Sequence, residues 1–452
     1  MWGISHSPVQ QRLLPYREFF LALIRALENE GLRLCVLRNH RGFPDKNTGN
    51  DIDCIILRSD LPRAIHALES IHCVRIVGYI ERYYAASIFL EGVDSAGDRS
   101  VQIDFHVSLS YKGLPFLFVE TVLQSAISHS VDGLTFFTLS PVHEAIISLF
   151  HGLLLGGVLK EKFFLEIQRT FSSEKSAVIA ALSTQFGLRV ATELVDAVIE
   201  GNRLKILGIA APLRRSLALR CGLARPVSSL DTVLKHCLRE FADRFLPQTM
   251  ENVSIVGLSA ASRKIIIEDL LANLRFSAKI LESGLFDPAS SLQSSRRAES
   301  DDRGVLPRLR LGHPVAIIEI VKWLLREWHA QFKNKKNLTL RIGDIPYDEP
   351  FMDSRKSVFA YSAWLVRIVA RLSPRPDLLI LLKGPIVGGM LSPSSLGGIR
   401  ESAIYPHVAK RAKQCFTLGY REHPDQVADA AYAAIIDALV QQTSKRLAKR
   451  FP

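Results

Sequence analysis

Two aspartates separated by one residue stand at the start of an apolar, β-branched run. The segment Gly49–Leu57 contains Asp51 and Asp53, and alternate residues of a strand point to the same side. Carboxylates held that close repel each other unless a cation lies between them, and Mg²⁺ prefers oxygen ligands. The spacing therefore predicts a magnesium site on a strand. Solvated turn residues are the alternative, because Gly49-Asn50 is typical of a turn.

A third carboxylate lies further along the chain, within a second predicted strand. Residues 101–107 alternate apolar and polar side chains around Asp104, with the period of two that marks a strand. If the two strands are neighbours, the three acids converge. Such a set suits two-metal phosphoryl transfer, so we expect two Mg²⁺ ions. His106 shares the face of Asp104 and either contacts phosphate or acceptor or is a half-buried structural residue.

Three short segments carry a family resemblance, and they are Cys35–Asn39, Asn50–Asp53 and Gln102–Phe105. Their order resembles the nucleotidyltransferase superfamily typified by DNA polymerase β, closest to branches found among polysaccharide-biosynthesis proteins. The resemblance implies that Asp51 and Asp53 bind the metals and that Asp104 activates an acceptor hydroxyl. It also implies an NTP as the donor substrate.

The nucleotide contacts implied by the resemblance depart from the family pattern. Arg38-Asn39 stands where the family has Gly-Ser. Arg38 would supply a charge and Asn39 a hydrogen bond, but the missing glycine prevents the closest backbone approach to phosphate. Residues 140–162 resemble the helical segment that closes the family's nucleotide cleft, where a lysine either reaches the triphosphate or ends a solvated helix. The expected nucleotide-binding residues are Arg38, Asn39, Gly49, Asn50, Lys160 and Lys162.

The predicted elements that position these residues form an α/β protein of several domains. Helices over 16–30 and 61–68, with strands over 72–79 and 84–91, predict a small mixed-sheet domain that ends near residue 125. The apolar stripe that starts at Pro141 predicts a helical subdomain over 126–245. Residues 246–452 then predict a three-layer α/β/α domain.

This last domain carries a second resemblance, to thymidylate-kinase-like P-loop proteins. Residues 252–265 have the strand, loop and helix of a P-loop, but only Gly257 of the motif remains. Ser262, Arg263 and Lys264 replace the second glycine, the lysine and the magnesium-binding hydroxyl, and Asp344 retains the acid of the family's Asp-Arg-Tyr signature. Ile345 replaces the arginine of that signature, and Gly388-Gly389-Met390 stands where the family has a lid with Arg and Lys. Losing these cations together with the magnesium-binding hydroxyl should remove several kcal/mol of transition-state stabilisation. The motif is therefore degenerate.

Composition limits the partners that the chain can have. The 452 residues carry a net charge of +12, which favours anionic partners such as nucleotides. No block of like charges supports nucleic-acid binding. Six cysteines without a C-x-x-C pair predict a reduced, cytoplasmic protein. No signal peptide or transmembrane segment is evident, and the sequence does not determine an oligomeric state.

Three functions are compatible with these observations. The leading hypothesis is a Mg²⁺-dependent nucleotidyltransferase that moves an NMP group from an NTP to a hydroxyl or phosphate of a small molecule or sugar. The second is a thymidylate-kinase-like phosphotransferase in which Arg263 and Lys264 replace the missing groups. The third is a non-catalytic nucleotide-binding regulator.

Overall fold

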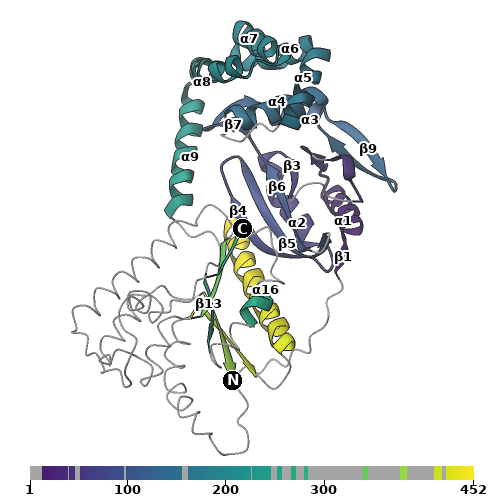
Figure 1. Ribbon diagram of the computed structural model, residues 1–452, viewed down its shortest axis with the longest axis vertical. Helices are drawn as coiled ribbons and strands as arrows, with labels where there is room; N and C mark the ends of the chain where they lie inside the picture. Colours follow the sequence, from purple (N-terminus) through teal and green to yellow (C-terminus); the bar gives the residue numbers. More distant parts are fainter. Residues whose placement is uncertain are drawn as a thin grey trace, which may run out of the picture. The chain divides into compact units, whose positions relative to one another are not determined.

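The protein divides into two compact units. The computed structural model describes residues 13–38, 40–45, 51–95, 98–154, 161–224, 226–245, 252–256, 266–270, 279–282, 339–344, 377–383, 412–419 and 424–451. Residues 11–246 and 443–452 form what we call the N-terminal unit, and residues 1–10 and 247–442 form the C-terminal unit. Figure 1 shows the elements of both. The three domain boundaries expected from the sequence remain predictions.

The N-terminal unit is built on a mixed eight-stranded sheet in the order β1-β5-β6-β3-β2-β10-β9, with β4 paired to β5. Its strands are β1 (Leu14–Pro15), β2 (Cys35–Val36), β3 (Asp51–Ile55), β4 (Arg75–Glu81), β5 (Ala85–Ser95), β6 (Asp98–His106), β9 (Ile127–Val131) and β10 (Leu134–Thr138). A separate hairpin joins β7 (Leu109–Tyr111) to β8 (Leu114–Leu117). The expected mixed α/β class is confirmed for this unit, and the sheet extends past residue 125 because β10 pairs with β2.

Two helices cover one face of this sheet, α1 (Tyr16–Asn29) and α2 (Leu61–Glu69). The apolar side chains of α1 recur at helical spacing, and Phe19, Phe20 and Leu23 are fully buried against the sheet. Gly31 follows α1 with a φ of 65°, the left-handed conformation that commonly ends a helix. Both helices confirm the elements expected there.

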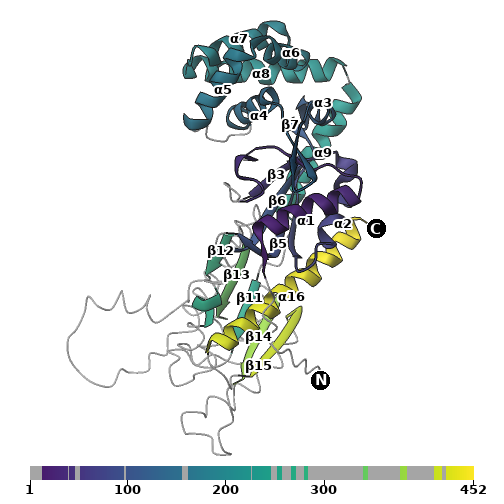
Figure 2. The same ribbon diagram turned by 90° about the vertical axis from the view of Figure 1, so that its right-hand side faces the viewer.

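A helical region covers the opposite face. Its helices are α3 (Val119–Gln124), α4 (Pro141–Leu153), α5 (Glu161–Ser173), α6 (Lys175–Phe186), α7 (Leu188–Ile199), α8 (Arg203–Ala224) and α9 (Pro226–Phe245). Cys35, Leu37 and Ile55 contribute to the same buried cluster as α4, so the helical region packs directly on β2 and β3. Figure 2 shows α4 to α8 gathered at one end of this unit. The expected helical region after Pro141 is therefore confirmed.

The C-terminal unit contains a parallel five-stranded sheet in the order β12-β13-β11-β14-β15. Its described strands and helix are β11 (Asn252–Val256), β12 (Lys279–Glu282), β13 (Thr339–Asp344), β14 (Leu378–Lys383), β15 (Gln414–Gly419) and α16 (Pro424–Arg450). Residues 378–382 are all buried and apolar, as expected of a strand covered on both faces. Gly257, Ser262, Arg263 and Lys264 lie outside the described residues, and Asp344 ends β13. The P-loop assignment remains a prediction.

The last residues of α16, from Thr443 onward, belong to the N-terminal unit, where they meet a buried glutamate. Two nitrogens of Arg450 each donate a 2.7 Å hydrogen bond to the carboxylate of Glu81. The Tyr79 hydroxyl donates to the same carboxylate at 3.1 Å, and Arg239 of α9 donates to the Glu81 carbonyl oxygen at 2.8 Å. Glu81 therefore connects β4 to two helices that are distant in the sequence.

Among the described helices, none combines the length and the apolar character that a bilayer crossing requires.

Candidate metal centre

The three aspartates predicted to bind metal come together on two neighbouring strands. β3 and β6 run parallel, with Asp53 opposite Asp104 and Asp51 opposite Gln102. One carboxylate oxygen from each of the three acids lies within 4.8 Å of the other two. The expected convergence of the acids is confirmed, and the cluster could hold a metal ion.

The alternation of the two strands explains why the acids share one face. Ile52 and Cys54 of β3, with Ile103 of β6, are fully buried in the core beneath α1 and α2. Alternate side chains must then project to the opposite face, which is the face toward the helical region. Asp53 is only 2 % exposed, whereas Asp51 and Asp104 are partly exposed. The site is therefore open to a ligand from the side of Asp51 and Asp104.

Electrostatics indicate that the cluster is suited to a cation. Burial and the charges of Asp53 and Asp104 raise the pKa of Asp51 to about 6. Burial also raises the pKa of Asp53, but the hydrogen bond and charge of His106, together with Arg38, outweigh it and lower this pKa to about 2. A divalent ion would relieve the repulsion that Asp51 experiences. The oxygen-only ligand set fits Mg²⁺ or Mn²⁺.

Two neighbouring side chains already hold the buried carboxylate. Arg38 donates from Nε to Oδ2 of Asp53, and Nε2 of His106 lies 3.2 Å from Oδ1. Gln102 donates to Oδ1 of Asp104 at 2.9 Å. Arg38 thus contacts an acid in this structure, and its predicted phosphate contact remains a prediction. His106 has a defined contact to Asp53, which the sequence left open.

A second histidine lies near the acids and was missed by the sequence reasoning. Partial burial lowers the pKa of His151 on α4, and the charges of Arg38, Asp53 and His106 also act on it. The helical region therefore places α4 beside the site. The sequence signals were the position of His151 inside an apolar stripe and its place within residues 140–162, which resemble the family's cleft-closing helical segment.

The remaining residues expected to contact a nucleotide cannot be placed. Asn39, Gly49, Asn50 and Lys160 lie outside the described residues. Lys162 belongs to α5, but its side chain is also outside them. Their contact with a nucleotide stays a prediction.

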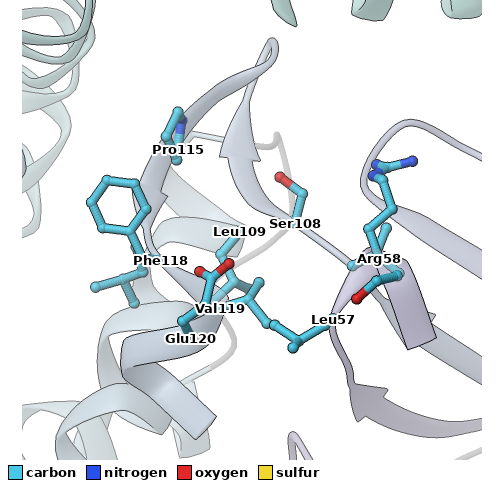
Figure 3. Close-up of a pocket in the computed structure, with 11 residues that line it drawn as sticks. Leu57, Arg58, Ser108, Leu109, Pro115, Phe118, Val119 and Glu120 are labelled. Atoms are coloured by element: carbon cyan, nitrogen blue, oxygen red, sulfur yellow. The ribbon is translucent and has the colours of Figure 1, made fainter. Parts of the chain in front are cut away.

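A cavity of about 290 Å³ lies beyond the carboxyl ends of β3 and β6, near the lower limit of typical ligand pockets. Figure 3 shows the Ser108 hydroxyl, Arg58 and Glu120 around it, with Phe118 and Leu109 on its apolar side. Ser108 is four residues beyond Asp104, so the two are roughly 13 Å apart along the strand direction. The cavity is therefore separate from the acidic cluster, and Asp51, Asp53 and Asp104 are not among the residues that line it.

Comparisons with known proteins add little to this geometry. No family model matches the chain, and no curated protein matches it. Among solved structures, the crystal structure of JHP933 from Helicobacter pylori is similar over 51 % of this chain and 100 % of that chain, with 8 % sequence identity and a TM-score of 0.22. A likeness at that TM-score supports no conclusion. What the fold and the site define is a mixed α/β protein with a carboxylate cluster suited to a metal ion.

The contact between Arg38 and Asp53 leads to a prediction about metal affinity. A metal that binds Asp53 must compete with the Arg38 guanidinium, so replacing Arg38 by Met should tighten Mn²⁺ binding by roughly five- to tenfold. Isothermal titration calorimetry on the full chain measures this. Arg33→Met is the control, because Arg33 lies over the Phe137 ring. Weaker Mn²⁺ binding by Arg38→Met than by Arg33→Met would contradict the prediction.

Proposed function

We propose that the protein is a Mg²⁺-dependent nucleotidyltransferase that moves an NMP group from an NTP to a hydroxyl or phosphate of a small molecule or sugar. The observation that carries the proposal is the convergence of three carboxylates within 4.8 Å on adjacent parallel strands. The net charge of +12 also suits a polyanionic substrate.

Each residue of the cluster has a distinct role in this proposal. Asp51 and Asp53 hold metal, and Asp104 shares a metal and accepts the proton of the attacking hydroxyl. Bound Mg²⁺ supplies charge neutralisation of the triphosphate and lowers the pKa of that hydroxyl. The acceptor oxygen forms a bond to the α-phosphorus while the bond to the β-phosphate oxygen breaks, and pyrophosphate leaves. His106 holds Asp53 in place, and Gln102 orients Asp104.

The cavity beyond the carboxyl ends of β3 and β6 is proposed to hold the distal end of the acceptor, because Ser108 in its wall is roughly 13 Å from Asp104 along the strand direction. Ser108 and Glu120 offer a hydroxyl and an anion around an apolar wall, which is a lining that can hydrogen-bond hydroxyl groups. Arg58 also lines the cavity, but its guanidinium contacts the carbonyl oxygen and the ring of Tyr83. A sugar or sugar phosphate fits that chemistry. A sugar acceptor would also agree with the resemblance to polysaccharide-biosynthesis proteins.

A product assay distinguishes this function from phosphoryl transfer. The full chain is incubated with each common NTP, Mg²⁺ and a set of sugars and sugar phosphates, and pyrophosphate and γ-phosphate transfer are measured separately. We expect acceptor-dependent pyrophosphate release that stops when EDTA is added. Transfer of the γ-phosphate alone would contradict the proposal.

The C-terminal unit supports a second candidate, a kinase-like phosphotransferase. β11 is central in its parallel sheet, with β13 and β14 on either side. Open parallel sheets bind ligands beyond the carboxyl ends of the strands, where the strand order reverses. Arg263 and Lys264 follow β11 in the sequence. This candidate requires ATP-dependent phosphorylation that is retained in Asp53→Asn and lost in the double variant Arg263→Ala/Lys264→Ala. Nucleotide binding without any turnover would instead favour the hypothesis of a non-catalytic regulator.

A further inference from the structure

Helix α9 turns its polar side chains toward the protein. His236 is 7 % exposed, and its ring centroid lies 5.2 Å from that of Tyr83. Arg239 donates to the carbonyl oxygen of Glu81 at 2.8 Å. The Thr232 backbone passes close to Gly113 in the β7–β8 turn. A Cβ added at Gly113 would lie 2.8 Å from the Thr232 carbonyl oxygen. The face of α9 that packs on its own unit is therefore mostly polar, with Val233 as a partly buried apolar member.

The outward face of the same helix is apolar. Figure 1 shows α9 beside the sheet, with one side turned away from the strands. Five large side chains, which we call the α9 row, are between 55 % and 81 % exposed: Val227, Leu230, Leu234, Leu238 and Phe241. A helix on the surface of a soluble protein normally shows the reverse arrangement. A contiguous exposed apolar row of this kind marks an interaction surface.

The spacing of the α9 row fits a second copy of the same helix. Successive members are separated by three, four, four and three residues, so the row is symmetric about Leu234. At 100° per residue the five side chains lie within an arc of roughly 80°, which is narrow and suits contact with another helix. A two-fold axis through Leu234 would place Leu230 opposite Leu238 of the partner subunit and Val227 opposite Phe241 of the partner subunit. Self-complementary spacing is what an isologous interface requires.

We propose that the α9 row is the interface of a homodimer in which two α9 helices pack antiparallel about Leu234. The five exposed side chains of the α9 row offer roughly 600 Å² per copy, which is in the range of a small specific interface. Asp231 and Lys235 pair within one helix at 2.7 Å, so they add little net charge beside the row.

The mass of the full chain in solution tests the proposal. Light scattering after size exclusion should give twice the 50.5 kDa of one chain. Leu234→Glu places two carboxylates against each other at the two-fold axis, and should weaken the dimer at least about a hundredfold. Ser228→Glu, which adds the same charge at an exposed position outside the row, should leave the dimer intact. A monomeric wild-type chain, or an unaffected Leu234→Glu dimer, would overturn the proposal.

Disulfide formation tests the antiparallel geometry independently of the charge variant. In a Cys237→Ser background, Leu234→Cys should form an intermolecular disulfide on mild oxidation. Leu230→Cys should not, because an antiparallel pair separates the two Leu230 positions by roughly 12 Å along the helix axis. Adding Leu238→Cys to Leu230→Cys should restore the cross-link. Cross-linking of Leu230→Cys alone would contradict this arrangement. If the wild-type chain is a monomer that binds anionic vesicles, and Leu234→Glu abolishes this binding, the α9 row binds a lipid surface and the dimer proposal is wrong.

Discussion

Replacing Asp53 by Asn is expected to lower metal-dependent pyrophosphate release at least about a thousandfold. Asp53 is the most buried of the three acids, and it is also the residue that Arg38 and His106 contact. The amide removes a ligand charge and leaves those two side chains without their anionic partner. Asp51→Asn also removes a ligand charge and should give a loss of similar size. Initial rates at saturating Mg²⁺ and NTP provide the measurement.

The control for this loss is a variant with the same chemical change elsewhere in the sheet. Asp94→Asn alters an exposed carboxylate on β5 and should retain the wild-type rate. Circular dichroism spectra should be the same for all variants, so that a folding defect is excluded for Asp51→Asn at least. Pyrophosphate release by Asp51→Asn within tenfold of the Asp94→Asn rate would refute the assigned role.

Replacing Glu81 by Leu should lower the free energy of unfolding of the N-terminal unit by about 2–3 kcal/mol. Arg450 and Arg239 would lose a buried anionic partner, and the Tyr79 hydroxyl would lose its acceptor. We place the cost below that of a fully buried ion pair, because Arg450 is about half exposed and can reach water. Urea unfolding of the full chain, followed by circular dichroism, measures this.

Adding Arg450→Met to Glu81→Leu should recover part of the lost stability, because it removes one of the cations left behind. Glu240→Gln is the control, since the Glu240 side chain is 71 % exposed. If Glu81→Leu were no less stable than Glu240→Gln, the contacts at Glu81 would not contribute to stability.

The pKa of Glu81 adds a pH dependence to the same prediction. Burial raises this pKa, but the hydrogen bonds from Arg450 and the charge of Arg239 outweigh burial, so the pKa lies below its ordinary value of 4.5. Folding therefore favours the ionised form of Glu81. Its contribution to the free energy of unfolding is complete above pH 4.5 and is lost as the pH falls below that value. Glu81→Gln should lack this acid-dependent loss.

Local patterns were enough to predict the elements that position the candidate site. The strand that carries Asp51 and Asp53 and the alternating strand around Asp104 are short-range signals, and both are found as β3 and β6. Their pairing was not predicted, because the convergence of the acids was conditional on the two strands being neighbours, and the structure shows that β3 and β6 do pair. The helix before Gly31 was predictable because its apolar spacing and its end are both encoded locally.

Contacts between distant residues could not be predicted in the same way. The pairing of Glu81 with Arg450 joins residues 369 positions apart, and neither residue type indicates its partner. The contact of Arg38 with Asp53 was missed because the resemblance assigned Arg38 to a phosphate. The reversed polarity of α9 was also missed, since periodicity predicts that a helix has an apolar face but does not say which way that face points.

The central claim is that Asp51, Asp53 and Asp104 form one site for a divalent cation, and Mn²⁺ titration of the full chain followed by electron paramagnetic resonance tests it most directly. Wild-type protein should bind Mn²⁺, and Mg²⁺ should displace it. Asp51→Asn, Asp53→Asn and Asp104→Asn should each weaken Mn²⁺ binding at least about tenfold, whereas Asp94→Asn should not. Equal Mn²⁺ affinity in wild type and all three variants would contradict the claim.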